Sequence, residues 1–121
     1  MESIREIIFY KDHFDKFFEP LPQKVKGKID EVLFMFTIIE RMPKKFFKSI
    51  EDVKGLFEVR VEYGSNIYRI FCCFDKGSLV VLFNGFQKKT QKTPKKELDK
   101  AEKIMQEYFN EQKSNNNGNK K

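Results

Sequence analysis

Apolar and polar residues alternate along three consecutive stretches in the middle of the chain, at 56–62, 67–74 and 79–85. A period of two predicts half-buried β-strands. The short segments between them, 63–66 and 75–78, each contain a glycine and have the composition of tight turns. The pattern therefore predicts a three-stranded antiparallel meander.

Apolar residues recur at helical spacing in residues 12–19 and 23–42, and a proline-containing turn separates the two segments. Pro22 suits the first turn of the longer helix, and Pro43 ends it. We expect these helices to pair in antiparallel fashion and to cover one face of the sheet.

The remaining segments have weaker patterns. Residues 4–10 are apolar and predict one further short strand, whereas 44–55 have no clear period and are expected to form loop. Thr93 and Pro94 suit the N-cap and first position of a last helix. Its apolar positions are Leu98, Ala101, Ile104, Met105, Tyr108 and Phe109. Residues 111–121 are polar and of low complexity, so we expect a disordered tail.

Pairing the strands through their turns places two arginines side by side. A two-residue or a four-residue loop in the first turn puts Arg60 opposite Arg69, and the second turn puts Arg69 opposite Asn84. Directly opposed like charges destabilise a sheet by up to about 1 kcal/mol. Two guanidinium groups become favourable neighbours when a phosphate accepts hydrogen bonds from both. We therefore expect an anion site on this face, with the core on the other. The alternative is an ordinary surface network in which Glu58 and Glu62 neutralise the arginines.

A lysine-rich run follows the last predicted strand. It extends from Asn84 to Lys96 without an acidic residue, and its lysines are Lys88, Lys89, Lys92, Lys95 and Lys96. Cations at the start of a helix oppose the helix dipole, so this placement is unfavourable unless a polyanion binds there. The run also contains Phe86, which either stacks on a base or belongs to the core. A solvated charged surface is the alternative interpretation of the run.

The composition narrows the class of function. With 24 basic and 18 acidic residues, the 121-residue chain has a formal charge of +6, which favours a polyanionic partner such as nucleic acid. No segment approaches the roughly 18 apolar residues of a membrane span, and the first residues lack the layout of a signal peptide. Cys72 and Cys73 are adjacent, which disfavours a disulfide or a metal pair and fits a reducing cytoplasm. We expect one cytoplasmic domain at 1–110 with no metal or other cofactor.

Three strings in these segments resemble a known family. They are Gly-Leu-Phe-Glu-Val-Arg at 55–60, Tyr-Arg-Ile at 68–70 and Val-Leu-Phe-Asn-Gly-Phe-Gln-Lys-Lys-Thr-Gln-Lys-Thr-Pro at 81–94. They resemble toxins of type II toxin–antitoxin systems, in the HigB-like, phage-derived branch of the RelE/ParE superfamily. The resemblance covers roughly residues 4–110. It implies a RelE-like α+β fold, in which a helical hairpin packs on a twisted antiparallel sheet and a helix ends the chain.

The resemblance also implies an activity and partners. Such a toxin would be an mRNA endoribonuclease that acts on ribosome-bound message and inhibits translation, and a HigA-like helix-turn-helix antitoxin would bind it. By position, Arg60 and Arg69 match the strand arginines of the family. The motif after the last strand is matched by Phe86, Lys88 and Lys89, with Lys92 in the same string.

The acid–base residues of related toxins do not carry over. RelE-type enzymes place a tyrosine near the C-terminus, and some HigB relatives use histidines. Here Tyr108 lies on the apolar stripe of the last helix, and the single histidine, His13, lies in the first helix. We expect the tyrosine to be a core residue and the histidine to have no catalytic role.

For a nuclease of this kind we expect metal-independent cleavage, because the sequence has no cluster of His, Cys, Asp or Glu with metal-ligand spacing. Arg69, assisted by Arg60, would stabilise the transition-state charge. Lys88 or Lys89 would serve as base or acid, because neighbouring cations lower the pKa of a lysine. The expected RNA-binding residues are Lys54, Asn84, Phe86, Lys92, Lys95 and Lys96.

Other assignments remain open from sequence. Glu58 as the base is disfavoured because its predicted neighbours are Phe71 and Leu82. A ParE-like toxin directed against DNA gyrase has a similar scaffold and cleaves no RNA. A non-catalytic nucleic-acid-binding module would bind with strong salt dependence and leave the strand uncut.

Overall fold

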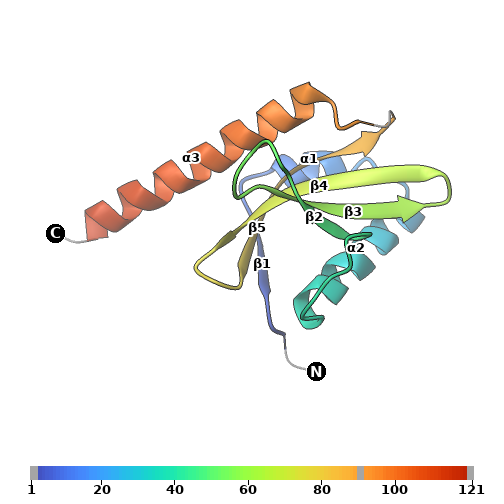
Figure 1. Cartoon of the computed structure of the whole chain (residues 1–121), viewed down its shortest axis with the longest axis horizontal. Helices are drawn as coiled ribbons and strands as arrows, with labels where there is room; N and C mark the ends of the chain where they lie inside the picture. Colours follow the sequence, from blue (N-terminus) through green and yellow to red (C-terminus); the bar gives the residue numbers. More distant parts are fainter. Residues whose placement is uncertain (1–2, 90–91, 120–121) are drawn as a thin grey trace.

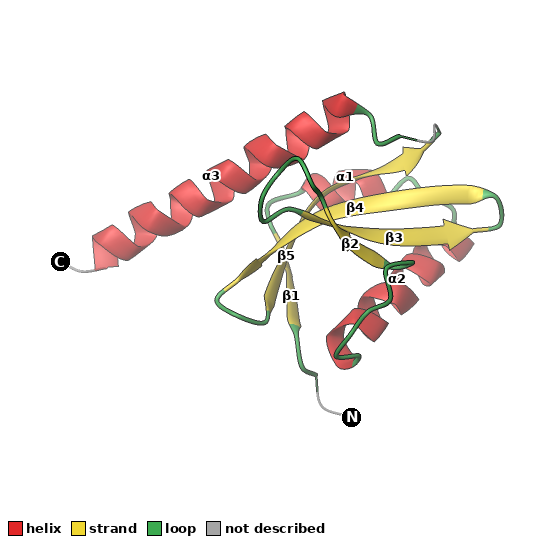
Figure 2. Cartoon of the chain, in the orientation of Figure 1, coloured by secondary structure: helices red, strands yellow, loops and turns green. Residues whose placement is uncertain are grey.

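The computed structural model describes residues 3–89 and 92–119, with side chains described up to residue 115. The elements of this part of the chain are β1 (Glu6–Phe9), α1 (His13–Phe18), α2 (Gln23–Ile38), β2 (Phe47–Ser49), β3 (Phe57–Tyr63), β4 (Asn66–Asp75), β5 (Leu79–Lys88) and α3 (Lys95–Asn119). They build an α+β fold around one five-stranded sheet of order β1-β5-β4-β3-β2, as Figures 1 and 2 show. The expected α+β class is confirmed.

The sheet is mixed, so the expectation of a purely antiparallel sheet is wrong. Strands β3, β4 and β5 form the predicted antiparallel meander. At one edge, however, β1 pairs with β5 in parallel, and at the other edge β2 pairs with β3. Strand β2 lies in the segment expected to be loop, and three residues are too few to show a period of two.

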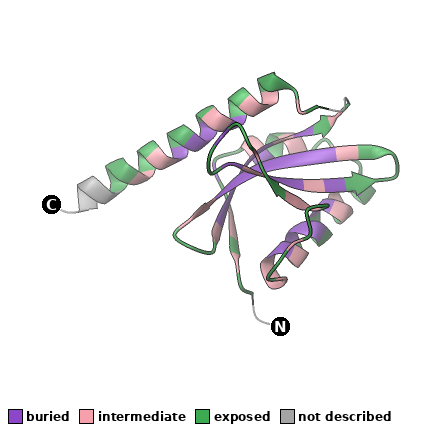
Figure 3. Ribbon diagram, in the orientation of Figure 1, coloured by how far each residue is buried: buried purple, intermediate pink, exposed green. Residues whose placement is uncertain are grey.

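Both faces of the sheet are covered, whereas the sequence predicted a single core on one face. Helices α1 and α2 pack on one face, and α3 packs on the other (Figure 3). Strands β4 and β5 carry apolar residues on both faces, which is typical of strands that are buried on both sides of a sheet. Ile70 and Leu82 belong to the first core, while their chain neighbours Phe71 and Phe83 belong to the second.

A β-bulge changes the register of β5. Asp75 pairs with Leu79 near the turn, but the pairing shifts by one between Ile70 and Cys72. The bulge lies where Gly85 closely approaches α1: a Cβ added to this glycine would lie 2.6 Å from the ring of Phe17. Only glycine fits this approach without a rearrangement.

Helix α2 ends at Ile38, several residues before the proline that was expected to end it. The guanidinium group of Arg5 donates hydrogen bonds to the carbonyl oxygens of Phe36 and Ile39 at 2.8 and 2.6 Å. A tertiary cap from the N-terminal segment therefore satisfies carbonyl groups that the helix itself leaves free.

Helix α3 continues through residues 111–119, the segment expected to be a disordered tail. Lys11 forms ion pairs with Glu107 at 2.5 Å and with Glu111 at 3.4 Å, which fasten this part of the helix to the β1–α1 corner. Residues 120 and 121 of the expected tail, and residues 90 and 91 of the lysine-rich run, lie outside the described residues. No helix in the described part of the chain is long and apolar enough to cross a membrane.

Candidate functional site

Two arginines and one glutamate form a compact group on the face of the sheet that α3 covers. Arg60 on β3 lies directly opposite Arg69 on β4, as the turns predicted. Glu58 lies two residues before Arg60 and therefore on the same face. Its Oε1 atom is 3.5 Å from Nε of Arg60 and 3.7 Å from Nε of Arg69. We call Glu58, Arg60 and Arg69 the arginine cluster.

The arginine cluster is buried and incompletely paired. Arg69 is 4% exposed and Glu58 is 5% exposed. The Nε atoms of both arginines and Oε2 of Glu58 have no hydrogen-bond partner among the described residues. Buried polar groups are nearly always paired in proteins, and a buried charge without partners is costly. The two Nε atoms are donors that an anion from outside the chain could satisfy, whereas Oε2 of Glu58 needs a donor.

The rest of each guanidinium group is held by backbone. Nη1 of Arg69 donates a hydrogen bond to the carbonyl oxygen of Tyr68 at 3.2 Å. Nη1 of Arg60 donates one to the carbonyl oxygen of Lys44 at 3.3 Å. Burial and the adjacent charge of Arg60 lower the pKa of Arg69. The alternative network with Glu58 and Glu62 is present only in part, because a single carboxylate lies within ion-pair distance of the two arginines among the described residues.

Lys88 is the lysine of the run that the fold brings to the arginines. It lies at the end of β5, two residues after the partner of Arg69, so its side chain lies on the same face. Burial lowers its pKa, and the charges of Arg69, Arg60 and Lys48 lower it further, while Glu58 opposes them. This is the direction that the sequence predicted. Lys89 is exposed and is the next residue along the chain.

A hollow of about 420 Å³ lies beside the arginine cluster, with Glu58 in its wall. Strand β2 contributes Lys48, which pairs with Glu58 across the strands. The segment before α3 contributes Lys92 and Thr93, and the segment after β2 contributes two acids, Glu51 and Asp52. The hollow therefore places lysines from two distant parts of the chain, together with carboxylates, beside the arginine cluster.

Two predicted site residues have different positions from those expected. Phe86, not Asn84, lies opposite Arg69 for two reasons: the second turn pairs Asp75 with Leu79 and not with the predicted Ser78, and the bulge shifts the register by one more residue. Phe86 is 8% exposed and its ring stacks on that of Phe71 at 5.7 Å, so it belongs to the core and is not open to a base. Asn84 is buried beside the bulge, and neither its Oδ1 nor its Nδ2 has a hydrogen-bond partner among the described residues.

Three predicted RNA-binding lysines lie on the surface around this region. Lys54 is exposed in the turn before β3, and Lys95 and Lys96 are exposed in the first turn of α3. None of the three is among the described residues that line the hollow beside Glu58. They can add to the positive potential near the site without forming part of its wall.

Tyr108 and His13 have structural surroundings. Tyr108 is 4% exposed, and its hydroxyl group donates to Oδ2 of Asp75 at 2.6 Å, which agrees with its prediction as a core residue. His13 is half-buried, and burial lowers its pKa. Its ring lies against Tyr10 at the β1–α1 corner, with centroids 6.2 Å apart.

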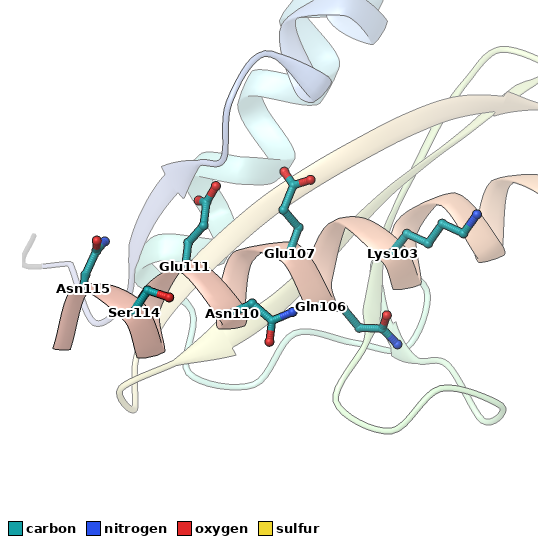
Figure 4. A pocket seen from close by; sticks show the side chains of 7 residues that line it. All are labelled: Lys103, Gln106, Glu107, Asn110, Glu111, Ser114 and Asn115. Atoms are coloured by element: carbon teal, nitrogen blue, oxygen red, sulfur yellow. The ribbon is translucent and has the colours of Figure 1, made fainter. Parts of the chain in front are cut away.

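A second hollow, of about 700 Å³, lies along the outer half of α3 (Figure 4). Its walls come from this one helix, and Glu107 and Glu111 project from the same side of it. Glu107 also accepts a hydrogen bond from the hydroxyl group of Tyr10 at 2.9 Å. Carboxylates paired in this way are unsuited to binding a phosphate.

The sequence interpretation missed the central position of Glu58 and the contribution of Lys48. Glu58 was compared with its predicted neighbours across the strands, whereas it contacts Arg60 two residues along its own strand and Arg69 diagonally on β4. Lys48 was assigned to loop, so its pairing with Glu58 was not foreseen. The alternation in Phe47-Lys48-Ser49 was the only signal available, and it spans three residues.

The arrangement is suited to binding and polarising a phosphate group. Two guanidinium groups face one carboxylate, and the adjoining hollow adds Lys48 and Lys92 together with Glu51 and Asp52, so cations outnumber carboxylates by one. Guanidinium groups donate to phosphate oxygens in pairs.

Comparison with known proteins places the chain in a family. The family model of phage-derived Gp49-like proteins (DUF891) matches residues 16–106, which include the arginine cluster, Lys88 and Lys92. The chain belongs to the Gp49-like family. This is a toxin-like family related to RelE/ParE-type toxins. No curated protein matches the chain at a significant level.

Membership of the Gp49-like family supports part of the resemblance seen in the sequence. The family match supports the relation to RelE/ParE-type toxins but does not distinguish the HigB-like branch from the others. In residues 3–89 and 92–119, no three His, Cys, Asp or Glu side chains are grouped so that they could hold a metal ion.

Proposed function

We propose that this Gp49-like protein is the HigB-like toxin of a type II toxin–antitoxin system and cleaves mRNA, without a metal ion, on the ribosome. The observation that carries the proposal is the arginine cluster: two opposed arginines share one carboxylate at long ion-pair distances, and their Nε atoms have no hydrogen-bond partner among the described residues. A phosphodiester supplies the acceptors that these groups lack.

The reaction needs no group other than RNA and side chains. The 2′-oxygen forms a bond to the adjacent phosphorus while the bond from phosphorus to the 5′-oxygen breaks. A base takes the proton of the 2′-hydroxyl group, and an ammonium group of the lysine-rich run gives one to the leaving 5′-oxygen. The products are a 5′-hydroxyl and a 2′,3′-cyclic phosphate, which water opens to a 3′-phosphate.

The side chains of the site divide these tasks by charge. Arg69, fixed by burial, donates to the phosphate oxygens as negative charge develops on them, and Arg60 assists from the neighbouring strand. Lys88 is the base, because its lowered pKa gives it a larger neutral fraction than an ordinary lysine has at the same pH. Lys92 binds the RNA backbone from the wall of the hollow.

We further propose that an acidic helix-turn-helix antitoxin of the HigA type binds the protein. Two surfaces are available to it: the basic face around the arginine cluster, and the outer half of α3, which extends beyond the sheet (Figure 1). A negatively charged partner complements the first surface. Co-expression of such an antitoxin should abolish growth inhibition by the toxin.

Purified protein tests the nuclease proposal on ribosomes loaded with a defined message, with and without EDTA. Wild type should cut the message in both conditions, leaving 5′-hydroxyl and cyclic phosphate ends. Arg69→Ala should lose cutting, and so should Arg60→Ala, which alters a more exposed residue and is the safer variant for folding. Lys76→Gln, at the turn between β4 and β5, is the control and should cut like wild type.

Other outcomes identify the alternatives. Growth arrest with intact messages would favour the gyrase-directed function. Salt-dependent RNA binding without cleavage would favour the non-catalytic module. If Arg69→Ala and Arg60→Ala fold and cut like wild type, the site is misassigned.

A further inference from the structure

We infer that the hollow on the far side of Arg60 is a binding subsite for the nucleotide that flanks the cleaved phosphate. The hollow has a volume of about 230 Å³ and is lined by Lys28, Lys45, Phe46, Arg60, Glu62 and Gly64. This inference rests on the proposed function, because it extends the path of the RNA strand beyond the arginine cluster.

Arg60 connects the two sites. Its Nε atom faces Glu58 in the arginine cluster, while Nη1 donates to the carbonyl oxygen of Lys44, which precedes two residues of the hollow. The backbone N–H of Arg60 also donates to the carbonyl oxygen of Phe46 at 2.7 Å, which holds the segment before β2 against β3. A strand bound at Arg69 and Arg60 would therefore reach this hollow with its next nucleotide.

The charge of the hollow suits a sugar-phosphate backbone. Its walls hold three cations, from α2, the segment before β2, and β3, and one carboxylate, Glu62. The cations are not strongly neutralised by other acids: Lys28 lies 3.6 Å from Glu31, whose side chain is 62% exposed, and Arg60 shares Glu58 with Arg69. The exposed pair of Lys28 and Glu31 is weak and can yield to a phosphate.

Phe46 supplies an aromatic surface in the same hollow. It is half-buried, and the ammonium group of Lys45 lies 5.5 Å from the centre of its ring. A base can replace this exposed cation on the ring, because every base has a face that stacks on an aromatic side chain. The sequence analysis considered Phe86 for base stacking, but Phe86 is buried. The structure therefore assigns base stacking to Phe46.

The test is the affinity of the full chain for a short single-stranded RNA made uncleavable by 2′-O-methyl groups, measured by fluorescence anisotropy at several salt concentrations. Phe46→Leu keeps an apolar side chain but removes the ring, and should weaken binding at least about five-fold. Phe46→Tyr should bind like wild type. Lys28→Gln combined with Lys45→Gln should lower the slope of log affinity against log salt by about 0.7 for one lost phosphate contact.

Two controls and a separate readout keep the inference distinguishable from the proposed function. Phe34→Leu, at a phenylalanine that is 63% exposed on α2, and Lys76→Gln should leave binding unchanged. If wild type cuts message but Phe46→Leu and the double lysine variant, both shown to be folded, bind RNA like wild type, the subsite is refuted and the nuclease stands. Phe46-dependent binding by a wild type that cuts nothing would support the subsite and refute the nuclease. A wild type that binds no RNA would refute both.

Discussion

Replacing Glu58 by Gln tests whether one carboxylate compensates two arginines inside the protein. The substitution keeps the shape of the side chain and removes its charge, so Arg60 and Arg69 become opposed cations with no acid within ion-pair distance among the described residues. Because Arg69 is 4% exposed, water can screen the repulsion only from the side of Arg60. We therefore expect the variant to fold with lower stability.

The magnitude follows from burial and distance. Removing one partner of a buried ion pair costs about 3–5 kcal/mol. Here the N–O distances of 3.5 and 3.7 Å are long for charged hydrogen bonds, and the Arg60 side chain is 26% exposed. We expect a loss near the lower end, about 2–3 kcal/mol in the free energy of unfolding.

Urea unfolding, followed by circular dichroism, measures this loss. The matched control is Glu62→Gln, because Glu62 is an exposed acid on the same face of β3, and its change should cost less than about 0.5 kcal/mol. Inorganic phosphate should raise the free energy of unfolding more in Glu58→Gln than in wild type, because it binds the folded arginine pair. Sodium chloride of equal ionic strength should raise the stability of Glu58→Gln less than phosphate does. Equal stabilities of Glu58→Gln and Glu62→Gln would refute the reasoning.

Three further outcomes are expected. The rate of RNA cleavage by wild type should rise with pH until Lys88 is neutral. Because the pKa of Lys88 is lowered, this rise should end at a lower pH than an ordinary lysine would require. A pH–rate profile checks this, and Lys88→Arg should remove both the rise and the activity. Gly85→Ala should lower stability by about 1–3 kcal/mol through the clash with Phe17, and Phe17→Leu in the same chain should relieve part of the loss in urea unfolding. Tyr108→Phe should cost about 1–2 kcal/mol by leaving Asp75 without its donor, yet should cleave RNA at the wild-type rate, which a catalytic tyrosine could not.

The sequence predicted the elements whose signals are local. Alternation and turn composition were enough for the meander of β3, β4 and β5, and the first turn was enough to place Arg60 opposite Arg69. Register next to a tight turn depends on a few neighbouring residues. It was read correctly at the first turn, whereas at the second turn Asp75 pairs with Leu79, one residue beyond the prediction. The helices also followed from spacing, although α2 ends earlier than its proline suggested.

Features that depend on distant parts of the chain could not be read in this way. The bulge that adds the second residue of register shift between Asn84 and Arg69 accompanies the approach of Gly85 to Phe17, a residue some seventy positions earlier in the chain. The parallel pairing of β1 with β5 likewise joins the start of the chain to its last strand. Neither contact leaves a local pattern, because each partner is chosen by packing.

The sequence by itself therefore determined that this is a basic α+β domain with two arginines side by side in a sheet. Only the tertiary structure decided that α3 covers that face, that Glu58 lies between the arginines, and that Phe86 is buried while Phe46 borders a hollow. The physical reason is that a side chain's charge and shape are local properties, whereas its burial and its partners depend on what the rest of the chain packs against it.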